Sequence, residues 1–268
     1  MATILTTGVT GTVINPLCIR LLEDGHTIVA LVRPTMGTSS EERLRSSINV
    51  NGNARDRLFT LQGDITKPFA GVSQEDLRRW RGRIDKVVHG AASTKFEETP
   101  EMMVCGTNIF GTQQVLLLAE HLGVQEFHHV STAYVGGDRE EFSEHENAWD
   151  GRPHRNVYER SKAYGEELVH NSGMRYSIYR IPIVIGSSHT GEINSFTGYY
   201  GFLAPFWQLR KGLLRKLQQD GTSLKEQGVW VDRNDFLHIP LAIPCSKLGP
   251  INLVPVDWLS IMMAGLVR

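Results

Sequence analysis

Short runs rich in β-branched and apolar residues alternate with longer segments of helical periodicity along the first two thirds of the sequence. The expected strands are Thr3–Thr7, Thr27–Arg33, Leu58–Gln62, Lys86–His89, Glu126–Ser131 and Tyr176–Ile185. The segments between them that are long enough for helices are Thr12–Glu23, Ser40–Ile48, Gln74–Trp80, Met102–His121 and Tyr158–Asn171. Such alternation is typical of parallel strands joined by right-handed crossovers. The sequence therefore predicts an α/β fold around a parallel sheet.

A glycine-containing turn follows the first expected strand, in the stretch TTGVTGTVINP. Gly8 and Gly11 are three residues apart, as in turns that hold a dinucleotide pyrophosphate at a helix N-terminus. Ile14 occupies the place of a third glycine, which lets helix and strand pack closely, so we expect these two elements to separate slightly. Pro16 is tolerated only in the first helical turn, so we expect a late helix start with Asn15 as the cap. The pattern indicates a modified dinucleotide-binding turn, with an ordinary tight βα turn as the alternative.

The second and third expected strands end in residues that suit the adenosine half of such a cofactor. About 20 residues after the glycines, where NAD-binding folds carry an acidic residue, the stretch ALVRP places Arg33. A guanidinium fork suits the 2′-phosphate of NADP, and Arg43 could assist; a surface arginine that closes a strand is the alternative. Asp64 and Ile65, in QGDI, follow the third strand, where an adenine edge would lie. We therefore expect NADPH as the cofactor.

The stretch NVYERSK places Tyr158 and Lys162 four residues apart, on one face of an expected helix. A neighbouring ammonium stabilises a phenolate and lowers its pKa from about 10 toward the range of a useful general acid. A structural helix pair is the alternative for these two residues alone. Thr132 comes at the carboxyl end of the fifth strand, the edge at which open parallel sheets bind ligands. It could donate a hydrogen bond to a substrate carbonyl oxygen beside Tyr158.

Further motifs fall at the same edge. The stretch VVHGAA ends the fourth strand in small residues, including Ala91, that leave room for a cofactor. The stretch NIFGTQQVLLLA places Asn108 early in a helix.

In order and spacing, the motifs TGVTG, LVR, GDI, HGAA, NIFGT, VST and YERSK resemble those of the extended short-chain dehydrogenase/reductases, over residues 3–186. The resemblance implies a Rossmann-type, doubly wound parallel sheet and a catalytic triad of Thr132, Tyr158 and Lys162. The expected cofactor-binding residues are Gly8, Thr10, Gly11, Arg33, Arg43, Asp64, Ile65, Ala91, Asn108 and Lys162. Ile14 and Pro16 depart from the family pattern and put the affinity for the cofactor in doubt.

Longer stretches resemble the thioester reductase branch, which includes fatty acyl-CoA reductases and the terminal reductases of peptide and polyketide assembly lines. These stretches are NVYERSKAYGEELV, YRIPIVIGSSHTGEINSFTGYYGF and INLVPVDW. The resemblance implies hydride transfer from NADPH to a small-molecule or carrier-bound acyl thioester, giving an aldehyde and sometimes then an alcohol. It also implies a homodimer through helices over 102–121 and 158–171. Two alternatives stay open: a nucleotide-sugar epimerase or dehydratase of the same fold, and a non-enzymatic cofactor-sensing or scaffold protein.

The βα alternation ends near residue 186, after which glycine, proline and aromatic residues become dense. We expect a dinucleotide-binding domain over residues 1–186 and a substrate-binding lobe over 187–268, with a returning strand near 251–256. Aromatic residues of the lobe are candidates for an acyl channel, although a packed amphipathic helix explains them as well; they are Tyr199, Tyr200, Phe202, Phe206 and Trp207. A helix begun by Asp257 reaches the end of the sequence, so either the lobe is small or the chain lacks its end.

Composition narrows the partners and the compartment. The net charge of −1, from 28 basic and 29 acidic residues, gives no general attraction to nucleic acid or to a membrane surface. Cys18, Cys105 and Cys245 are far apart, so neither a metal site nor a disulfide framework is expected. The longest apolar stretch, Tyr199–Leu209, is too short to span a bilayer, and the N-terminus does not read as a signal peptide. We expect a soluble, cytoplasmic oxidoreductase.

Overall fold

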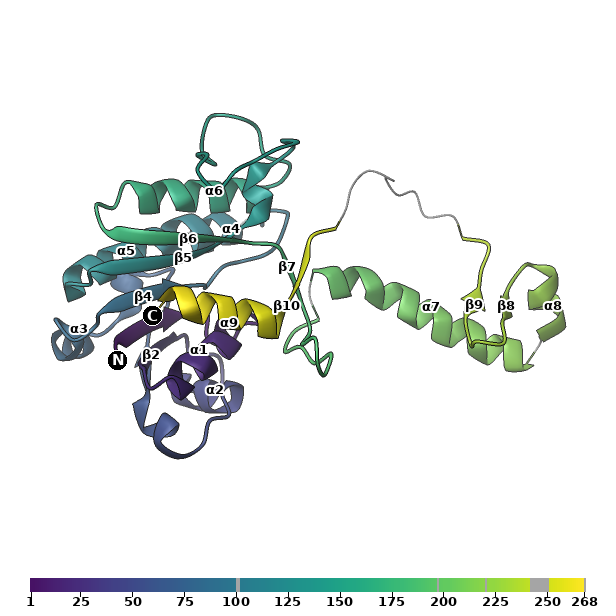
Figure 1. The fold of residues 1–268 in the computed structure, drawn as a ribbon, viewed down its shortest axis with the longest axis horizontal. Coiled ribbons are helices and arrows are strands. Elements are labelled where there is room, and N and C mark those ends of the chain that lie inside the picture. Colours follow the sequence, from purple (N-terminus) through teal and green to yellow (C-terminus); the bar gives the residue numbers. More distant parts are fainter. Residues whose placement is uncertain (100–101, 197, 220, 242–250, 268) are drawn as a thin grey trace. The chain divides into compact units, whose positions relative to one another are not determined.

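Six parallel strands form the central sheet of the computed structural model, which describes residues 1–99, 102–196, 198–219, 221–241 and 251–267 (Figure 1). In chain order these strands are β1 (Thr3–Thr7), β2 (Thr27–Val32), β3 (Leu58–Gln62), β4 (Lys86–His89), β5 (Glu126–Thr132) and β6 (Arg175–Ile181). Their order in the sheet is β3-β2-β1-β4-β5-β6, so the direction of winding reverses between β1 and β4. Open α/β sheets bind ligands at such a reversal, outside the carboxyl ends of the strands. The predicted doubly wound parallel sheet is confirmed.

Helices cover both faces of this sheet because its strands are apolar on both sides. Ile4 and Leu5 of β1 point to opposite faces, and both are fully buried. Ile4 packs with α1 (Ile14–Glu23), α2 (Ser40–Ser47) and α9 (Val256–Val267). Leu5 packs with α3 (Gln74–Trp80), α5 (Gly111–Leu122) and α6 (Val157–His170).

The expected helix over 102–121 is present but changes its pitch. It runs from α4 (Met103–Cys105) through a π-helical turn, η3 (Gly106–Phe110), into α5. π-Helical turns are rare and frequently occur at functional sites. Short 3-10 helices occur elsewhere in this part of the chain, namely η1 (Gly52–Arg57), η2 (Pro68–Gly71) and η4 (Ala133–Gly136).

The expected strand Tyr176–Ile185 is divided at Pro182, which lacks an N–H group for the sheet. After β6, the strand β7 (Ile183–Ile185) leaves the central sheet and pairs in parallel with β10 (Leu253–Pro255).

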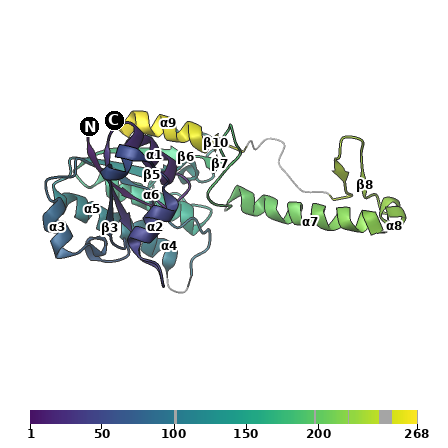
Figure 2. The ribbon, with the colours of Figure 1, turned by 90° about the horizontal axis from the view of Figure 1, so that it is seen from below.

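The chain forms two compact units, Met1–Ser195 with Leu253–Arg268, and Phe196–Asn252. These limits differ from the predicted division after residue 186. The residues after Leu253 return to the sheet unit because β10 pairs with β7 and the apolar side of α9, including Met263, packs against α1. Figure 2 shows the ribbon of α9 beside that of α1.

In its described residues the second unit forms the helices α7 (Tyr199–Gln219) and α8 (Gly221–Glu226) and an antiparallel pair, β8 (Trp230–Val231) with β9 (Leu237–His238). Its role as a substrate-binding lobe remains a prediction. Cys245 lies outside the described residues. Among the residues that are described, no helix has both the length and the apolar character needed to cross a membrane.

Candidate active site

The turn after β1 depends on glycine. Gly8 has φ +82°, and a Cβ atom there would lie 2.7 Å from both the amide nitrogen of Ala91 and the carbonyl carbon of Gly90. The amide nitrogen of Gly11 donates to the carbonyl oxygen of Gly8 over 2.8 Å, which closes the turn. The turns after β1 and β4 therefore approach each other closely at the reversal point, and Thr10 lies exposed in the first of them. This tight turn, with glycine at both ends and a helix directly after it, fits the pyrophosphate of a dinucleotide.

Ile14 is accommodated in a way that the sequence analysis did not anticipate. Its side chain is 1% exposed, and a Cβ atom on Gly90 would lie 2.3 Å from its Cγ1 atom. Ile14 thus fills the space that a third glycine of the turn would leave open. The glycine of this contact is Gly90, on the opposite side. The expected separation of helix and strand is replaced by this complementary packing.

The start of α1 also differs from the prediction. The helix begins at Ile14, so Pro16 lies within the first turn, as expected. Asn15 is not the cap: its Nδ2 atom donates to the carbonyl oxygens of Val9, over 3.2 Å, and Ser47, over 2.7 Å. Asn15 therefore ties the glycine turn to the end of α2.

Replacing Gly90 by alanine is expected to lower the free energy of unfolding by about 1–3 kcal/mol, because the new methyl group overlaps Ile14. The double variant Gly90→Ala/Ile14→Ala should recover part of the loss, since the shortened side chain frees that space. Urea unfolding of the parent, both single variants and the double variant measures the coupling. Strictly additive losses would show that Ile14 and Gly90 do not share this contact.

Two arginines gather at the carboxyl end of β2. Arg33 is exposed immediately after the strand, and the guanidinium of Arg43 donates to the carbonyl oxygen of Arg33. No acidic side chain of the described residues forms an ion pair with either one. The end of β2 therefore presents two cationic side chains, which fits a phosphate.

The residues after β3 serve mainly to shape their own loop. The Oδ1 atom of Asp64 accepts from the amide and the hydroxyl of Thr66, over 3.0 and 2.8 Å. Ile65 is buried against Gly111, where a Cβ atom would lie 2.8 Å from its Cδ1 atom. Both residues stay at the predicted edge of the sheet, but the structure gives each a local structural role.

Thr132 and Tyr158 come together at the carboxyl edge of β5. Thr132 is the last residue of β5, and its side chain lies close enough to the Tyr158 hydroxyl to lower the pKa of that group. Tyr158 is the second residue of α6, whose start is fixed by Asn156, because the Asn156 side chain accepts from the amide of Glu159 over 2.9 Å. The structure thus places two hydroxyl groups side by side where a ligand of the sheet would bind.

The Lys162 side chain lies on the sheet side of α6. Its Nζ atom donates to the carbonyl oxygen of Val130 over 2.7 Å and lies 3.2 Å from the Nε2 atom of His129. Burial lowers the pKa of Lys162 to about 8, against the opposing effect of the Glu166 carboxylate. The ammonium is thus a buried donor with a readily displaced proton.

The expected lowering of the Tyr158 pKa by Lys162 is not found. Burial raises the pKa of Tyr158 above its usual value, the hydrogen bond with Thr132 lowers it, and Glu159 and Tyr134 raise it further. Lys162, with its pKa lowered to about 8, loses its proton before Tyr158 ionises and therefore carries no charge that could stabilise the phenolate.

Buried histidines, which the sequence analysis did not single out, line the floor of the site. Burial lowers the pKa of His89 to about 3, and that of His129 well below its usual value. Both rings are therefore neutral near pH 7. His129 accepts from Lys162 through Nε2, so its Nδ1 atom carries the proton, and this atom has no hydrogen-bond partner within the described part of the chain. Because both imidazoles are neutral, Lys162 carries the positive charge next to them.

Asn108 joins two segments of the chain near the site, and its predicted contact with the cofactor stays a prediction. It lies in the π-helical turn, is 1% exposed, and its amide group exchanges two hydrogen bonds with the backbone of Ser93. Its Nδ2 atom also donates to Ser161, whose hydroxyl donates to the carbonyl oxygen of Tyr158. Asn108 therefore connects the loop after β4 to the first turn of α6, and its amide is fully used within the protein.

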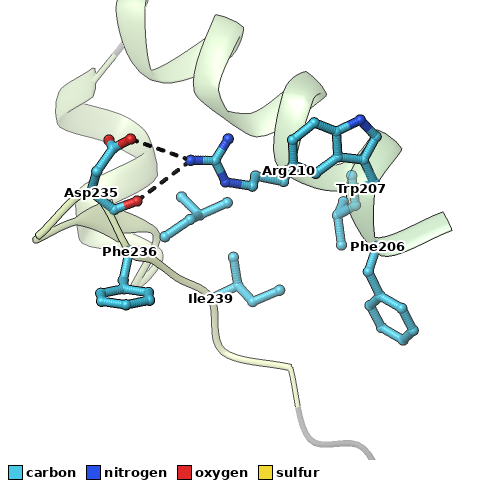
Figure 3. A pocket seen from close by; sticks show the side chains of 8 residues that line it. Phe206, Trp207, Arg210, Asp235, Phe236 and Ile239 are labelled. Carbon is cyan, nitrogen blue, oxygen red and sulfur yellow. Dashed lines mark hydrogen bonds and ion pairs between the residues drawn. The ribbon is translucent and has the colours of Figure 1, made fainter. Parts of the chain in front are cut away.

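The second unit contains a cavity of about 460 Å³ between α7 and the β8–β9 hairpin. Its lining residues are Phe206, Trp207, Leu209, Arg210, Asp235, Phe236, Leu237 and Ile239. Figure 3 shows Arg210 extending from α7 toward Asp235, with which it forms an ion pair of 3.5 Å. Phe206 and Trp207, two of the residues considered for an acyl channel, thus lie on a largely apolar cavity.

Fold and site together define a dinucleotide-binding domain of the extended short-chain dehydrogenase/reductase class, with two hydroxyl groups and a buried lysine at β5 and α6, beside the strand pair where the winding reverses. Residues 6–263 match the NAD-binding family described as Male sterility protein. The chain belongs to this family, and its resemblance to the thioester reductase and fatty acyl-CoA reductase branch is confirmed.

Relatives support the same branch. Fatty acyl-CoA reductase 1 of Mus musculus is 25% identical over 83% of this chain and 51% of its own length. The chain thus spans about half the length of the curated relatives that it matches. The terminal R domain from the myxalamid PKS-NRPS biosynthetic pathway is 26% identical, with a TM-score of 0.75 over 100% of this chain and 63% of that one. UDP-glucuronic acid 4-epimerase from Bacillus cereus is 27% identical, but its TM-score is 0.52 over 69% of this chain and 58% of that one.

Proposed function

We propose that this chain is the catalytic domain of an NADPH-dependent reductase that converts an acyl thioester, on a small molecule or a carrier, into an aldehyde. The observation that carries the proposal is the approach of the Thr132 side chain, at the carboxyl end of β5, to the hydroxyl of Tyr158 on α6. Two hydroxyl donors at one point suit a carbonyl oxygen that becomes negatively charged. Similarity to fatty acyl-CoA reductases and to an R domain favours a thioester over a sugar nucleotide.

Each residue has a defined part in this reaction. The nicotinamide cofactor, when bound, supplies the hydride for the substrate carbonyl carbon. Thr132 and Tyr158 donate hydrogen bonds to the oxygen of the tetrahedral intermediate and stabilise its charge. Its collapse re-forms the carbonyl and expels the thiolate, which leaves the aldehyde. Further reduction to an alcohol would require Tyr158 to transfer its proton to the oxygen, and Lys162 to support that transfer.

Glycine and arginine residues support the choice of cofactor. Gly8 and Gly11 suit the pyrophosphate, and Arg33 with Arg43 suits a 2′-phosphate. Thr10 and Ala91 lie at the two adjoining turns, where they would border the bound dinucleotide.

The proposed preference for NADPH predicts the effect of Arg33→Ala. Loss of one charge-assisted hydrogen-bond partner, worth about 1.5–3 kcal/mol, should weaken NADPH binding at least about tenfold. The affinity for NADH, which lacks the 2′-phosphate, should remain nearly unchanged. Calorimetric titration of both cofactors measures the difference, with Arg45→Ala, in α2, as the control. An equal loss for both cofactors would show that Arg33 does not bind the 2′-phosphate.

The activity itself is tested with purified protein, NADPH and a series of acyl-CoA and acyl-pantetheine thioesters. The expected result is consumption of NADPH together with release of free thiol and formation of aldehyde. Aldehyde formation without thiol release would point to another substrate. Absence of NADPH binding at millimolar cofactor would replace the enzyme with the scaffold protein considered above.

A homodimer through the helices near 102–121 and 158–171 remains a prediction. Exposed apolar side chains along the first of these helices, Met103, Phe110 and Leu117, support it. A cytoplasmic location is likewise retained as a proposal.

A further inference from the structure

A carboxylate that the proposed reaction does not use lies fully buried one helical turn beyond Lys162. Glu166 is 0% exposed, and its Oε1 atom accepts from the hydroxyl of Ser131 over 2.5 Å. Ser131 directly precedes Thr132 on β5. Glu166 and Lys162 lie four residues apart on α6 and therefore share one face of the helix. The carboxylate thus lies between the residue before Thr132 and the helix that carries Tyr158 and Lys162.

Arg180 of β6 compensates for the burial of this carboxylate. Its Nη2 atom donates to Oε2 of Glu166 over 2.8 Å, and its Nε atom lies 3.2 Å from each carboxylate oxygen. A two-pronged pair of this kind is short, directional and stronger than a neutral hydrogen bond. A buried ion pair is weak evidence for stability, because desolvation offsets most of the attraction. Its presence here therefore calls for another explanation.

The remaining donors of Arg180 hold the loop that leads into α6. Nη1 donates to the carbonyl oxygens of Ser143, over 3.0 Å, and Glu144, over 3.4 Å, and Nη2 donates to that of Glu146 over 2.7 Å. The guanidinium also lies 4.4 Å from the centre of the Phe142 ring. One side chain thus connects β6, α6 and the segment from Phe142 to Glu146.

We propose that Glu166 and Arg180 are positioning residues for the triad: Glu166 supplies the buried negative charge on the face of α6 that carries Lys162, and Arg180 fixes the loop that enters the helix of Tyr158. The proposal rests on the role assigned to Lys162 above. It assigns Glu166 an electrostatic function that a purely structural ion pair would lack.

The groups that face Lys162 determine the direction of the effect. His89 from β4 and His129 from β5 are neutral near pH 7, and Tyr158, one turn earlier on α6, is uncharged there. Glu166 is the anion that raises the pKa of Lys162 against burial, and Arg180 from β6 partly offsets its charge. Removing the charge of Glu166 should therefore lower the pKa of Lys162 below its value of about 8.

The test is the direct titration of Lys162 by NMR in protein with isotope-labelled lysine, with the resonance assigned by its absence in Lys162→Met. In Glu166→Gln, which keeps the shape of the side chain, the midpoint should fall by about one pH unit. In Glu166→Asp, which keeps the charge, most of the shift should be reversed. The measurement needs neither turnover nor cofactor, so failure of the proposed reaction leaves its outcome unaffected.

A matched control lies on the same helix. Glu159 is another buried carboxylate of α6 with an arginine partner, Arg155, but it is not among the groups that shift the pKa of Lys162. Glu159→Gln should leave the Lys162 midpoint unchanged. A midpoint that does not move in Glu166→Gln, or that moves equally in Glu159→Gln, overturns the electrostatic part of the proposal.

Arg180→Lys tests the role proposed for Arg180 separately from that of Glu166, because lysine keeps the charge and loses the guanidinium fork. The Lys162 midpoint should stay near that of the parent, whereas limited proteolysis between Phe142 and Glu146 should become several-fold faster. Unchanged proteolysis overturns the role assigned to Arg180. Equal stability to urea in Glu166→Gln and Glu159→Gln would confirm that a shift in midpoint does not come from unfolding.

Discussion

Tyr158→Phe is expected to lower kcat for thioester reduction by about 10²- to 10³-fold, the range typical of removing one hydrogen-bond donor to an oxyanion. The ring remains, so its packing beside Phe96, at 6.1 Å between ring centres, should be kept. Thr132 then has no hydroxyl partner with which to stabilise the oxyanion. The affinity for NADPH should be nearly the same as in the parent, because the glycine turn and Arg33 are untouched.

Steady-state kinetics and calorimetric titration of NADPH measure the two quantities. Tyr164→Phe is the matched control, since Tyr164 lies on the same helix but packs edge-on against Trp149, at 4.9 Å. Its kcat should equal that of the parent. If Tyr158→Phe turns over at nearly the parental rate, Tyr158 does not stabilise the oxyanion, and the assignment of the site is wrong.

Gly8→Ala is expected to cause the largest loss of stability, about 3 kcal/mol, and to abolish detectable dinucleotide binding. The new Cβ atom would lie 2.7 Å from backbone atoms of Gly90 and Ala91, which cannot move aside as a flexible side chain can. The φ of +82° adds strain for any residue with a side chain. The two turns would have to separate, and the space for a pyrophosphate would be lost with them.

Gly37→Ala isolates the contribution of the backbone angle. Gly37 has φ +78°, but a Cβ atom there meets nothing within 4 Å. Its cost should therefore be about 1 kcal/mol, the strain of the left-handed conformation alone. Urea unfolding compares the two variants. Equal losses would show that the clash between the turns after β1 and β4 is not what requires glycine at position 8.

The sequence predicts most of the sheet because local signals define its elements. The strands β1, β3 and β4 match their predicted limits, since each is a short run followed directly by a glycine, namely Gly8, Gly63 and Gly90. The split after Ile181 was missed although Pro182 signals it, because the apolar run continues on both sides.

The site was only partly predictable. Thr132 and Tyr158 meet as expected, because a strand end and a helix start can be located from sequence. The contact of Lys162 with His129 joins residues 33 positions apart, and only the packed structure shows which face of β5 meets α6. Two features of the sequence could have suggested buried polar groups beneath the site. They are the HHVST stretch and Glu166, one helical turn after Lys162.

The limits of the second unit were likewise not predictable from local sequence. The return of β10 to pair with β7 depends on contacts between residues about 70 positions apart, and register across that distance is not encoded in local periodicity. The alternation of helices and strands predicts a fold class well, but it does not predict where a chain that leaves a sheet returns to it.

The contact between Ile14 and Gly90 changes how a nucleotide-binding fingerprint should be searched for. The crossing of α1 with the turn after β4 limits the combined volume of the two side chains at this contact. The residue without a side chain can stand at either position. A pattern that demands glycine at one fixed place tests only half of that condition. A search that scores positions 14 and 90 as a pair would accept a large residue at one when the other has none, and would find turns of this kind that a single-segment pattern rejects.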